Sequence, residues 1–180
     1  METIRFSSIC RKNGLELDDG HLAKLEEYVS LLVDWNTRIN LISRNDTANI
    51  WNNHILHSLS ILFFEEIPTE SRLLDLGTGG GLPGIPLAIV RTDLNVTLLD
   101  SIKKKTTAVQ AIVNNLSITN VKVVTGRAEE IGRRREFSKQ YDLVVSRAVA
   151  PLDNLIKWSG SFVKQEGSRL IALKGGDLND

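Results

Sequence analysis

Apolar residues recur at helical spacing along the first third of the chain. Six of them between residues 22 and 39 follow one another at steps of three and four, which places them on one face of a helix. Asp18 stands where the N-cap of this helix is expected. A second helical run covers residues 47–62, and the polar connector 40–46 separates the two runs. The pattern therefore predicts an N-terminal helical extension over residues 1–66.

From residue 67 the pattern changes to short apolar runs separated by helical segments. The helical segments include 82–90, a run that Ser101 can cap, and one that Pro151 can start and that extends through Phe162. Strands that alternate with helices form right-handed crossovers and a parallel sheet with helices on both faces. The sequence therefore predicts an α/β fold whose doubly wound, mostly parallel sheet occupies residues 67–180. The predicted strands are 73–76, 96–99, 121–124, 143–145 and 170–173.

Composition excludes several classes of protein. The chain has 180 residues, of which 42% are hydrophobic and 24% charged, and these values are typical of one soluble globular domain. The single cysteine, Cys10, excludes a disulfide framework. No apolar run approaches the roughly 18 residues of a membrane span, and the N-terminus lacks the apolar core of a signal peptide. We therefore expect a cytoplasmic monomer that does not contact membranes.

The glycine-rich turn DLGTGGGLPG, residues 75–84, follows the first predicted strand and is the most informative segment. Glycines allow positive φ and let a ligand approach the backbone, and open α/β sheets bind ligands at the carboxyl ends of their strands. A nucleoside-triphosphate phosphate loop is excluded because Ile85 follows Gly84 where that motif needs lysine. Gly79, Gly81 and Gly84 do fit the dinucleotide string G-x-G-x-x-G, so the string alone leaves NAD open.

Two acidic residues favour a different ligand from NAD. Asp75 stands two places before the first glycine, Gly77, where a carboxylate suits a cationic amino-acid end better than a pyrophosphate. The pattern acid-x-Gly-x-Gly-x-Gly is typical of S-adenosylmethionine-dependent methyltransferases. Asp100 ends the second strand and can accept hydrogen bonds from both ribose hydroxyls, or it can serve only as a helix N-cap with Ser101. The residues alone therefore predict a methyltransferase-like Rossmann domain, with an NAD-dependent oxidoreductase as the alternative.

A set of ordered motifs extends this interpretation over nearly the whole chain. The motifs occupy residues 40–41, 54–58, 75–87, 98–101, 127–130, 146–148 and 173–175. Together they resemble those of the ribosomal RNA small subunit methyltransferase G family, also called the glucose-inhibited division protein B family. The chain departs from the family pattern at His57, where aspartate is usual, and at Gly80, where proline or alanine is common. It also ends at Asp180, where the family continues into a final antiparallel pair of strands.

The resemblance implies a Rossmann-like class I methyltransferase fold, with residues 67–180 binding S-adenosyl-L-methionine. It also implies methylation of guanine N7 in bacterial 16S rRNA, with the RNA or the small ribosomal subunit particle as partner. A non-catalytic RNA-binding protein on the same fold is a further alternative. Spacing assigns Asp75, Gly79, Gly81 and Asp100 to the cofactor. The resemblance adds Gly77, Leu82, Ala128, Glu129 and Arg147.

The chemistry of guanine N7 needs few protein groups. Its lone pair lies in the ring plane and is free at neutral pH, so we expect no catalytic acid or base. Methylases of exocyclic amines carry Asn/Asp-Pro-Pro-aromatic after the fourth strand, where this chain has SRAVAP at 146–151. A pyrimidine C5 methylase needs a cysteine nucleophile, and Cys10 lies outside the predicted sheet domain. His54 and His57 could begin a metal site, but no third ligand is evident, so we expect no metal.

Contacts to RNA are predicted around the ligand site. The 22 basic and 22 acidic side chains give a formal net charge of zero, which argues against binding nucleic acid by bulk charge. The local basic run 103–105 is compatible with phosphate contacts. We assign Arg127 and Lys174 to RNA phosphates, and Asn40 and His54 to the substrate side of the N-terminal extension. For each of them, the alternative is an ordinary solvated side chain.

Overall fold

The computed structural model describes residues 2–43, 46, 49–147 and 150–173. Its N-terminal part is helical, and from Arg72 strands alternate with helices, as the sequence predicts. The helices are α1 (Glu2–Lys12), α2 (Asp19–Asn36), the π-helix η2 (Trp51–Leu56), α3 (His57–Leu59), α4 (Ile61–Phe64), α5 (Gly84–Val90), α6 (Lys103–Asn115), α7 (Ala128–Ile131) and α8 (Leu152–Ser159). The strands are β1 (Arg72–Leu76), β2 (Asn95–Asp100), β3 (Val121–Thr125), β4 (Leu143–Arg147) and β5 (Arg169–Leu173).

The five described strands pair in parallel in one sheet, in the order β3-β2-β1-β4-β5. This order confirms the predicted α/β fold with a doubly wound parallel sheet. The central strand β1 lies between β2 and β4, and its Asp75 is level with Leu98 on one side and Val145 on the other. Because the strand order reverses at β1, the crevice at the carboxyl end of this strand is where a ligand is expected to bind.

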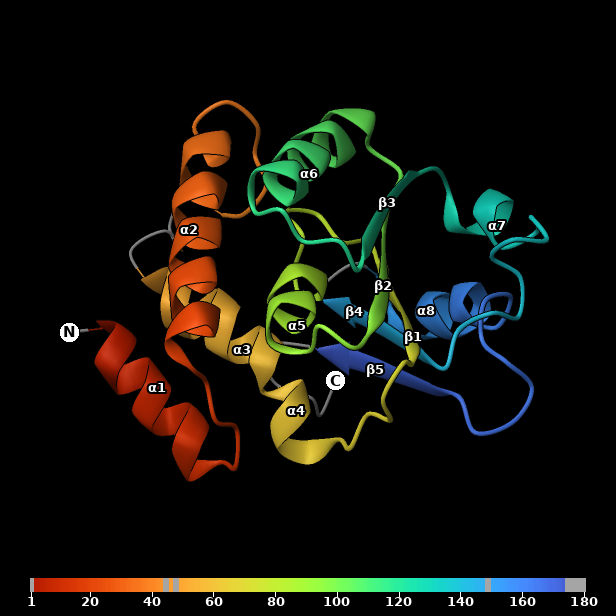
Figure 1. Cartoon of the computed structure of the whole chain (residues 1–180). Coiled ribbons are helices and arrows are strands. Elements are labelled where there is room, and N and C mark those ends of the chain that lie inside the picture. The colour runs from red at the N-terminus through yellow and green to blue at the C-terminus, as the bar shows by residue number, and fades with distance from the viewer. Residues whose placement is uncertain (1, 44–45, 47–48, 148–149, 174–180) are drawn as a thin grey trace.

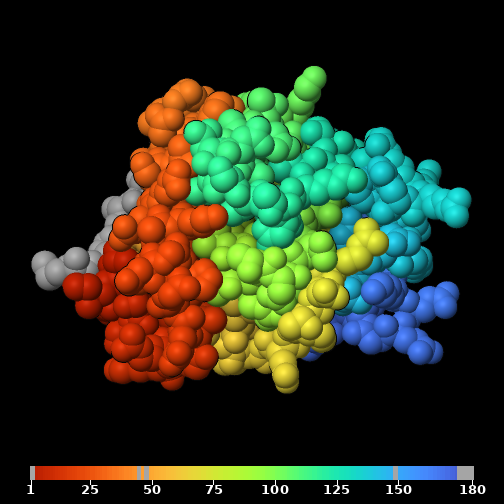
Figure 2. Space-filling view, viewed as in Figure 1, coloured from red at the N-terminus to blue at the C-terminus, as the bar shows by residue number. Residues whose placement is uncertain are grey.

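Helices cover both faces of the sheet (Figure 1). Helices α5 and α6 pack on one face, and α7 and α8 lie on the other. The N-terminal helix α2 packs on the outer side of α5 and α6, and Figure 2 shows the N-terminal helices in direct contact with that layer. One buried apolar cluster accordingly runs from Phe6 and Leu25 through Ile85 to Leu98. The N-terminal helices and the sheet therefore share a hydrophobic core.

Three side chains accept hydrogen bonds from backbone amides at the two ends of α2. Asp18 forms a capping box, in which its Oδ1 accepts from the His21 amide at 2.7 Å and the His21 ring accepts from the Asp18 amide at 3.3 Å. Beyond the helix, Asn36 Oδ1 accepts from the amides of Leu41 and Ile42 at 2.8 and 3.0 Å. These bonds turn the connector inward. Leu41 and Ile42 are buried, so the prediction of a polar connector is wrong for them.

Two helix boundaries in the structure also differ from the predicted ones. Ile102 occupies the N-cap position of α6 without a side-chain hydrogen bond, so Ser101 is not the cap. Asp100 Oδ1 instead accepts from the Ile102 amide at 2.9 Å. Helix α8 ends at Ser159 with Gly160 as its C-cap, and the buried Phe162 belongs to the turn that follows.

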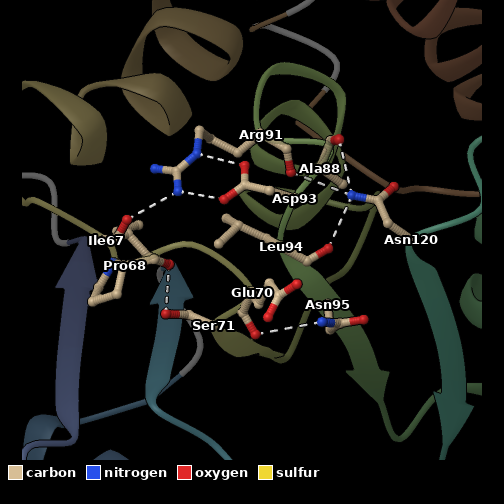
Figure 3. A network of polar contacts seen from close by, with 10 residues as sticks. All are labelled: Ile67, Pro68, Glu70, Ser71, Ala88, Arg91, Asp93, Leu94, Asn95 and Asn120. Carbon is tan, nitrogen blue, oxygen red and sulfur yellow. Dashed lines mark hydrogen bonds and ion pairs between the residues drawn. The ribbon is translucent and has the colours of Figure 1, made fainter.

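Side-chain hydrogen bonds tie together the loops at the amino ends of the strands (Figure 3). Arg91 forms an ion pair with Asp93 at 2.7 Å between Nη2 and Oδ2. The Asn120 amide nitrogen lies 3.2, 3.3 and 3.1 Å from the carbonyl oxygens of Ala88, Arg91 and Leu94. One side chain thus links the end of α5 to the loops before β2 and β3, at the edge of the sheet opposite the expected ligand crevice.

Replacing Asn120 by alanine is expected to lower the free energy of unfolding by about 1.5–3 kcal/mol, because three part-buried carbonyls lose their shared donor. Urea denaturation measures this change. Asn114→Ala is the matched control, since Asn114 is exposed on α6 and its side chain accepts a hydrogen bond from the exposed Gln110 side chain. We expect a change within about 0.5 kcal/mol there. Equal losses in the two variants would contradict a bridging role for Asn120.

Two further features concern the described ranges only. None of the helices in these ranges is long and apolar enough to cross a lipid bilayer. Within the same ranges, no three His, Cys, Asp or Glu side chains lie where they could hold a metal ion together.

Candidate active site

A cleft of about 740 Å³ opens at the carboxyl ends of the strands. The glycine-rich loop after β1, the end of β2 and the turn after β3 line one part of it. The N-terminal part of the chain lines another, through the connector after α2 and through η2. Arg147, the last residue of β4, also faces the cleft. The cleft therefore joins the helical extension to the sheet at the topological switch point.

The cleft brings together most of the residues that the sequence assigns to a cofactor. Asp75 and Gly81 are buried and do not line it, so their contact with a cofactor stays a prediction. The assigned residues that do line the cleft are Gly77, Gly79, Leu82, Asp100, Ala128, Glu129 and Arg147.

The residues assigned to RNA divide in the same way. His54 and Arg127 line the cleft, whereas Asn40 is exposed beside the cleft-lining Leu41 without lining it. Lys174 lies outside the described residues. Sequence analysis did not select Asp46 and Asn53, which also line the cleft. Asn53 directly precedes His54 in the sequence, and this position is the sequence signal that could have identified Asn53 as a cleft residue.

Asp75 holds the glycine-rich loop closed. Its Oδ2 accepts from the Thr78 hydroxyl at 2.6 Å and from the Gly84 amide at 2.8 Å. The side chain is fully buried, and Oδ1 has no hydrogen-bond partner among the described residues. Burial raises the pKa of this carboxyl to about 6, although the bonds from Thr78 and Gly84 and the charge of Arg147 oppose the rise. Asp75 therefore fixes the conformation of the loop from its buried side, since it does not line the cleft itself.

Helix α2 braces the same loop from the opposite side. The buried Tyr28 hydroxyl donates to the Gly80 carbonyl at 3.0 Å. A Cβ on Gly80 would lie 2.9 Å from Leu32 Cδ1 and 3.3 Å from Leu41 Cβ, so the missing side chain permits this close packing. Tyr28 has no local sequence signal as a loop contact, because the bond spans 52 positions of the chain.

Asp100 connects the loop to the end of β2. Its Oδ2 accepts from the Gly79 amide at 3.0 Å, and Oδ1 accepts from the Ile102 amide. Each carboxylate oxygen has a second lone pair, so Asp100 can still accept from two hydroxyl groups in the cleft. Gly77 and Gly79 adopt φ values of 77° and 57°, a conformation that glycine tolerates at no steric cost.

Arg147 and His54 form the polar contact between the two parts of the chain. Arg147 Nη1 lies 2.6 Å from His54 Nδ1 and 3.4 Å from the Asn53 carbonyl oxygen. On the other side of the ring, His54 Nε2 is 3.8 Å from Asp46 Oδ2. Burial, with the charge of Arg147 as the second cause, lowers the pKa of His54 to about 4, so the imidazole is neutral near pH 7. His54 is therefore a buried side chain, and the alternative of a solvated histidine is wrong.

Comparison with known proteins identifies the family. The profile of the family described as GidB, rRNA small subunit methyltransferase G, matches residues 21–180. The ribosomal RNA small subunit methyltransferase G of Thermoanaerobacter sp. (strain X514) is 40% identical over 167 residues, which cover 93% of this chain and 69% of that protein. The protein of the same name from Chlorobium phaeobacteroides is 42% identical over 172 residues, covering 96% and 75%. The chain belongs to this family.

Solved structures show that this rRNA small subunit methyltransferase G family member has the class I methyltransferase fold that the sequence predicts. The Haemonchus contortus phosphoethanolamine N-methyltransferase 2 in complex with S-adenosyl-L-methionine is similar with a TM-score of 0.53 and 22% identity, over 64% of this chain and 27% of that one. A variant of MtNAS in complex with S-adenosylmethionine is similar with a TM-score of 0.56 and 17% identity, over 83% and 55%. At such identities the likeness concerns the fold alone.

The buried carboxyl of Asp75 makes the stability of this family member depend on pH. Its pKa is raised when the protein folds, so the stabilisation is complete below about pH 4 and is lost as the pH rises through about 6. Asp75→Asn keeps an acceptor for Thr78 and Gly84 but cannot ionise. We expect the unfolding free energy of the wild type, relative to that of the variant, to fall by about 2–3 kcal/mol between pH 4 and pH 7. Denaturation at both pH values measures the difference, and parallel pH profiles would contradict it.

Proposed function

We propose that the protein transfers a methyl group from S-adenosyl-L-methionine to N7 of a guanine in bacterial 16S rRNA, presented as RNA or as the small ribosomal subunit particle. The names of the relatives at about 40% identity support an rRNA substrate. The observation that carries the proposal is the cleft, where the family's cofactor residues in the sheet domain meet His54 of the N-terminal helices. We expect the protein to act in the cytoplasm as a monomer.

The residues of the cleft fit this cofactor. Gly77 and Gly79 have positive φ, and among the described residues a Cβ added to Gly79 would meet nothing nearer than the Leu41 carbonyl oxygen at 3.7 Å, so these residues leave the space beside the loop open. Asp100 would accept from the ribose hydroxyls, and the backbone of Ala128 would lie at the adenine edge. Arg147 would face the carboxylate of the amino-acid end. Bound there, S-adenosylmethionine supplies an electrophilic methyl group on a sulfonium.

The chain's own task is then to position the base. Guanine N7 carries a lone pair at neutral pH, so no side chain needs to remove a proton. The positive charge passes from the sulfonium to the purine and is not newly created. Holding the two reacting atoms in line can lower the barrier by several kcal/mol, up to about 7–11 kcal/mol at the ideal limit. We therefore propose no catalytic acid or base among the cleft residues.

Arg127 and Lys105 both line the cleft, and we propose that they contact RNA phosphates. Replacing Arg127 by alanine is expected to weaken RNA binding about equally for all sequences and to reduce the salt slope of the binding constant by about one unit. Lys24→Ala, on the exposed side of α2 and away from the cleft lining, is the matched control. RNA binding across a salt series measures both slopes. Identical salt slopes for Arg127→Ala and the wild type would show that Arg127 is an ordinary solvated side chain that does not contact RNA phosphate.

Mapping of methylated guanines tests the function directly. Small-subunit rRNA from cells with and without the gene is cleaved chemically at N7-methylguanine, and we expect one site that depends on the gene. The purified protein should restore that site when S-adenosylmethionine is added. Calorimetry separates the alternatives: tight NAD binding with no response to S-adenosylhomocysteine would favour an oxidoreductase. RNA binding without any methyl transfer would favour a non-catalytic protein.

A further inference from the structure

The cleft holds a buried hydrogen-bonding group that lacks a partner. His54 is only 6% exposed, and its Nε2 makes no hydrogen bond to any described residue. Asp46 Oδ2 is the nearby acceptor, but 3.8 Å is too long for a hydrogen bond. Both side chains line the cleft, and Nε2 itself is buried in the cleft wall, so a bound molecule contacts it once the side chains at that wall move aside.

The neighbours of His54 determine what Nε2 can do. Arginine stays protonated in proteins and only donates, so His54 Nδ1 must accept from Arg147 across the 2.6 Å contact. A neutral imidazole that accepts at Nδ1 carries its proton at Nε2. His54 Nε2 is therefore a donor. Leaving such a donor buried and unpaired is costly, about 1–3 kcal/mol, which favours a ligand that supplies an acceptor.

We propose that His54 Nε2–H donates to O6 of the target guanine and so selects guanine over adenine; this inference rests on the proposed function. On the edge that carries N7, guanine presents the O6 acceptor, whereas adenine presents an amino donor. An adenine in the same pose would bring two donors together and leave both unpaired. The contact also fixes the rotation of the base, which sets where N7 points.

The charge of Asp46 indicates that the acceptor for His54 Nε2–H comes from the base and not from the cofactor. The carboxylate of the amino-acid end would be repelled by Asp46 if it lay beside His54 Nε2, whereas the neutral O6 carbonyl would not. After methyl transfer the purine is positively charged, and a neighbouring carboxylate stabilises that charge. A neutral His54 leaves this stabilisation intact, whereas an imidazolium would oppose it.

Two substitutions test the roles of the two ring nitrogens of His54 individually. His54→Asn retains an acceptor near the Nδ1 position, toward Arg147, and loses the donor at Nε2. His54→Gln reaches the Nε2 position with an amide donor and loses the shorter contact. We measure kcat/KM with RNA that carries guanine or 2-aminopurine at the mapped target position, because 2-aminopurine has N7 and no O6. Affinity for S-adenosylhomocysteine is measured in parallel.

The wild type should prefer guanine over 2-aminopurine by about tenfold to a hundredfold. His54→Asn should lose most of that preference while binding S-adenosylhomocysteine within about twofold of the wild type, and His54→Gln should retain the preference. An unchanged preference in His54→Asn would overturn the proposal, as would a loss confined to cofactor affinity. If His54→Asn does not fold, equal kcat/KM of the wild type for both bases overturns it. Failure of the proposed function is a separate result, namely no methylation of guanine N7 by the wild type.

Discussion

Replacing Gly84 by alanine is expected to lower the free energy of unfolding by about 3–5 kcal/mol, from overpacking and from a disturbed buried carboxylate together. A Cβ at this position would lie 2.3 Å from Leu98 Cδ2, 2.8 Å from Asp75 Oδ2 and 3.0 Å from Asp75 Cβ. These side-chain atoms have little room to move, because Leu98 and Asp75 are fully buried on the adjacent strands β2 and β1. Chemical denaturation measures the loss.

A second glycine next to a helix is the control for Gly84. A Cβ on Gly160 would meet the Ile156 carbonyl at 3.4 Å and the Lys157 carbonyl at 3.7 Å, which are close to ordinary contacts. We expect Gly160→Ala to change stability by less than about 1 kcal/mol. Similar losses in both variants would show that the close approach of α5 to β1 and β2 does not require glycine.

Replacing Gly79 by valine is expected to weaken binding of S-adenosylhomocysteine by more than about a hundredfold, because the added side chain would occupy the ligand's space. The residue has φ +57°, which a β-branched side chain adopts poorly, and its amide donates to Asp100. A strained loop would also release the Asp100 carboxylate from its position. Isothermal titration calorimetry measures the affinity, and denaturation measures the accompanying loss of stability.

Gly167→Val is the control that distinguishes the effect of backbone strain from the loss of the ligand site. Gly167 has φ +71°, and no described residue comes within 4 Å of its added Cβ, so Gly167→Val carries the same kind of strain at a position that does not line the cleft. Both valine variants should lose about 1–2 kcal/mol of stability, and only Gly79→Val should lose the ligand. If the affinity for S-adenosylhomocysteine falls to the same degree in both variants, Gly79 affects binding through the stability of the fold and not through direct contact with the ligand.

Strands β1, β2 and β4 could be predicted because they are buried on both faces, and such strands appear in a sequence as short continuous apolar runs. Strands β3 and β5 are only partly buried, but their apolar residues still formed short runs between helical segments. The end of β2 at Asp100 and the glycine-rich turn after β1 followed from the same local pattern. The connector after α2 could not be predicted in this way. Its burial depends on the Asn36 side chain, whose bonds to Leu41 and Ile42 no local pattern indicates.

The candidate site shows the same division. The family resemblance assigned Arg147, the last residue of β4, and Ala128, the first residue of α7, to the cofactor, and both line the cleft. The environment of His54 could not be predicted, because Arg147 is 93 positions away and the two meet only after the helices dock. Asp75 illustrates a related limit: the acid-x-Gly pattern selects the residue, but only the fold shows that its Oδ2 binds Thr78 and Gly84 of its own loop.

The hydrogen bond from Tyr28 to Gly80 has a thermodynamic consequence. It couples the docking of α2 to the conformation of the loop beside which the ligand binds. By linkage, any ligand that favours the observed loop conformation must stabilise the docked α2 by the same free energy, and undocking of α2 must weaken the ligand to the same degree. The N-terminal helices thereby contribute energetically to the proposed cofactor site, even though Tyr28 itself does not line the cleft.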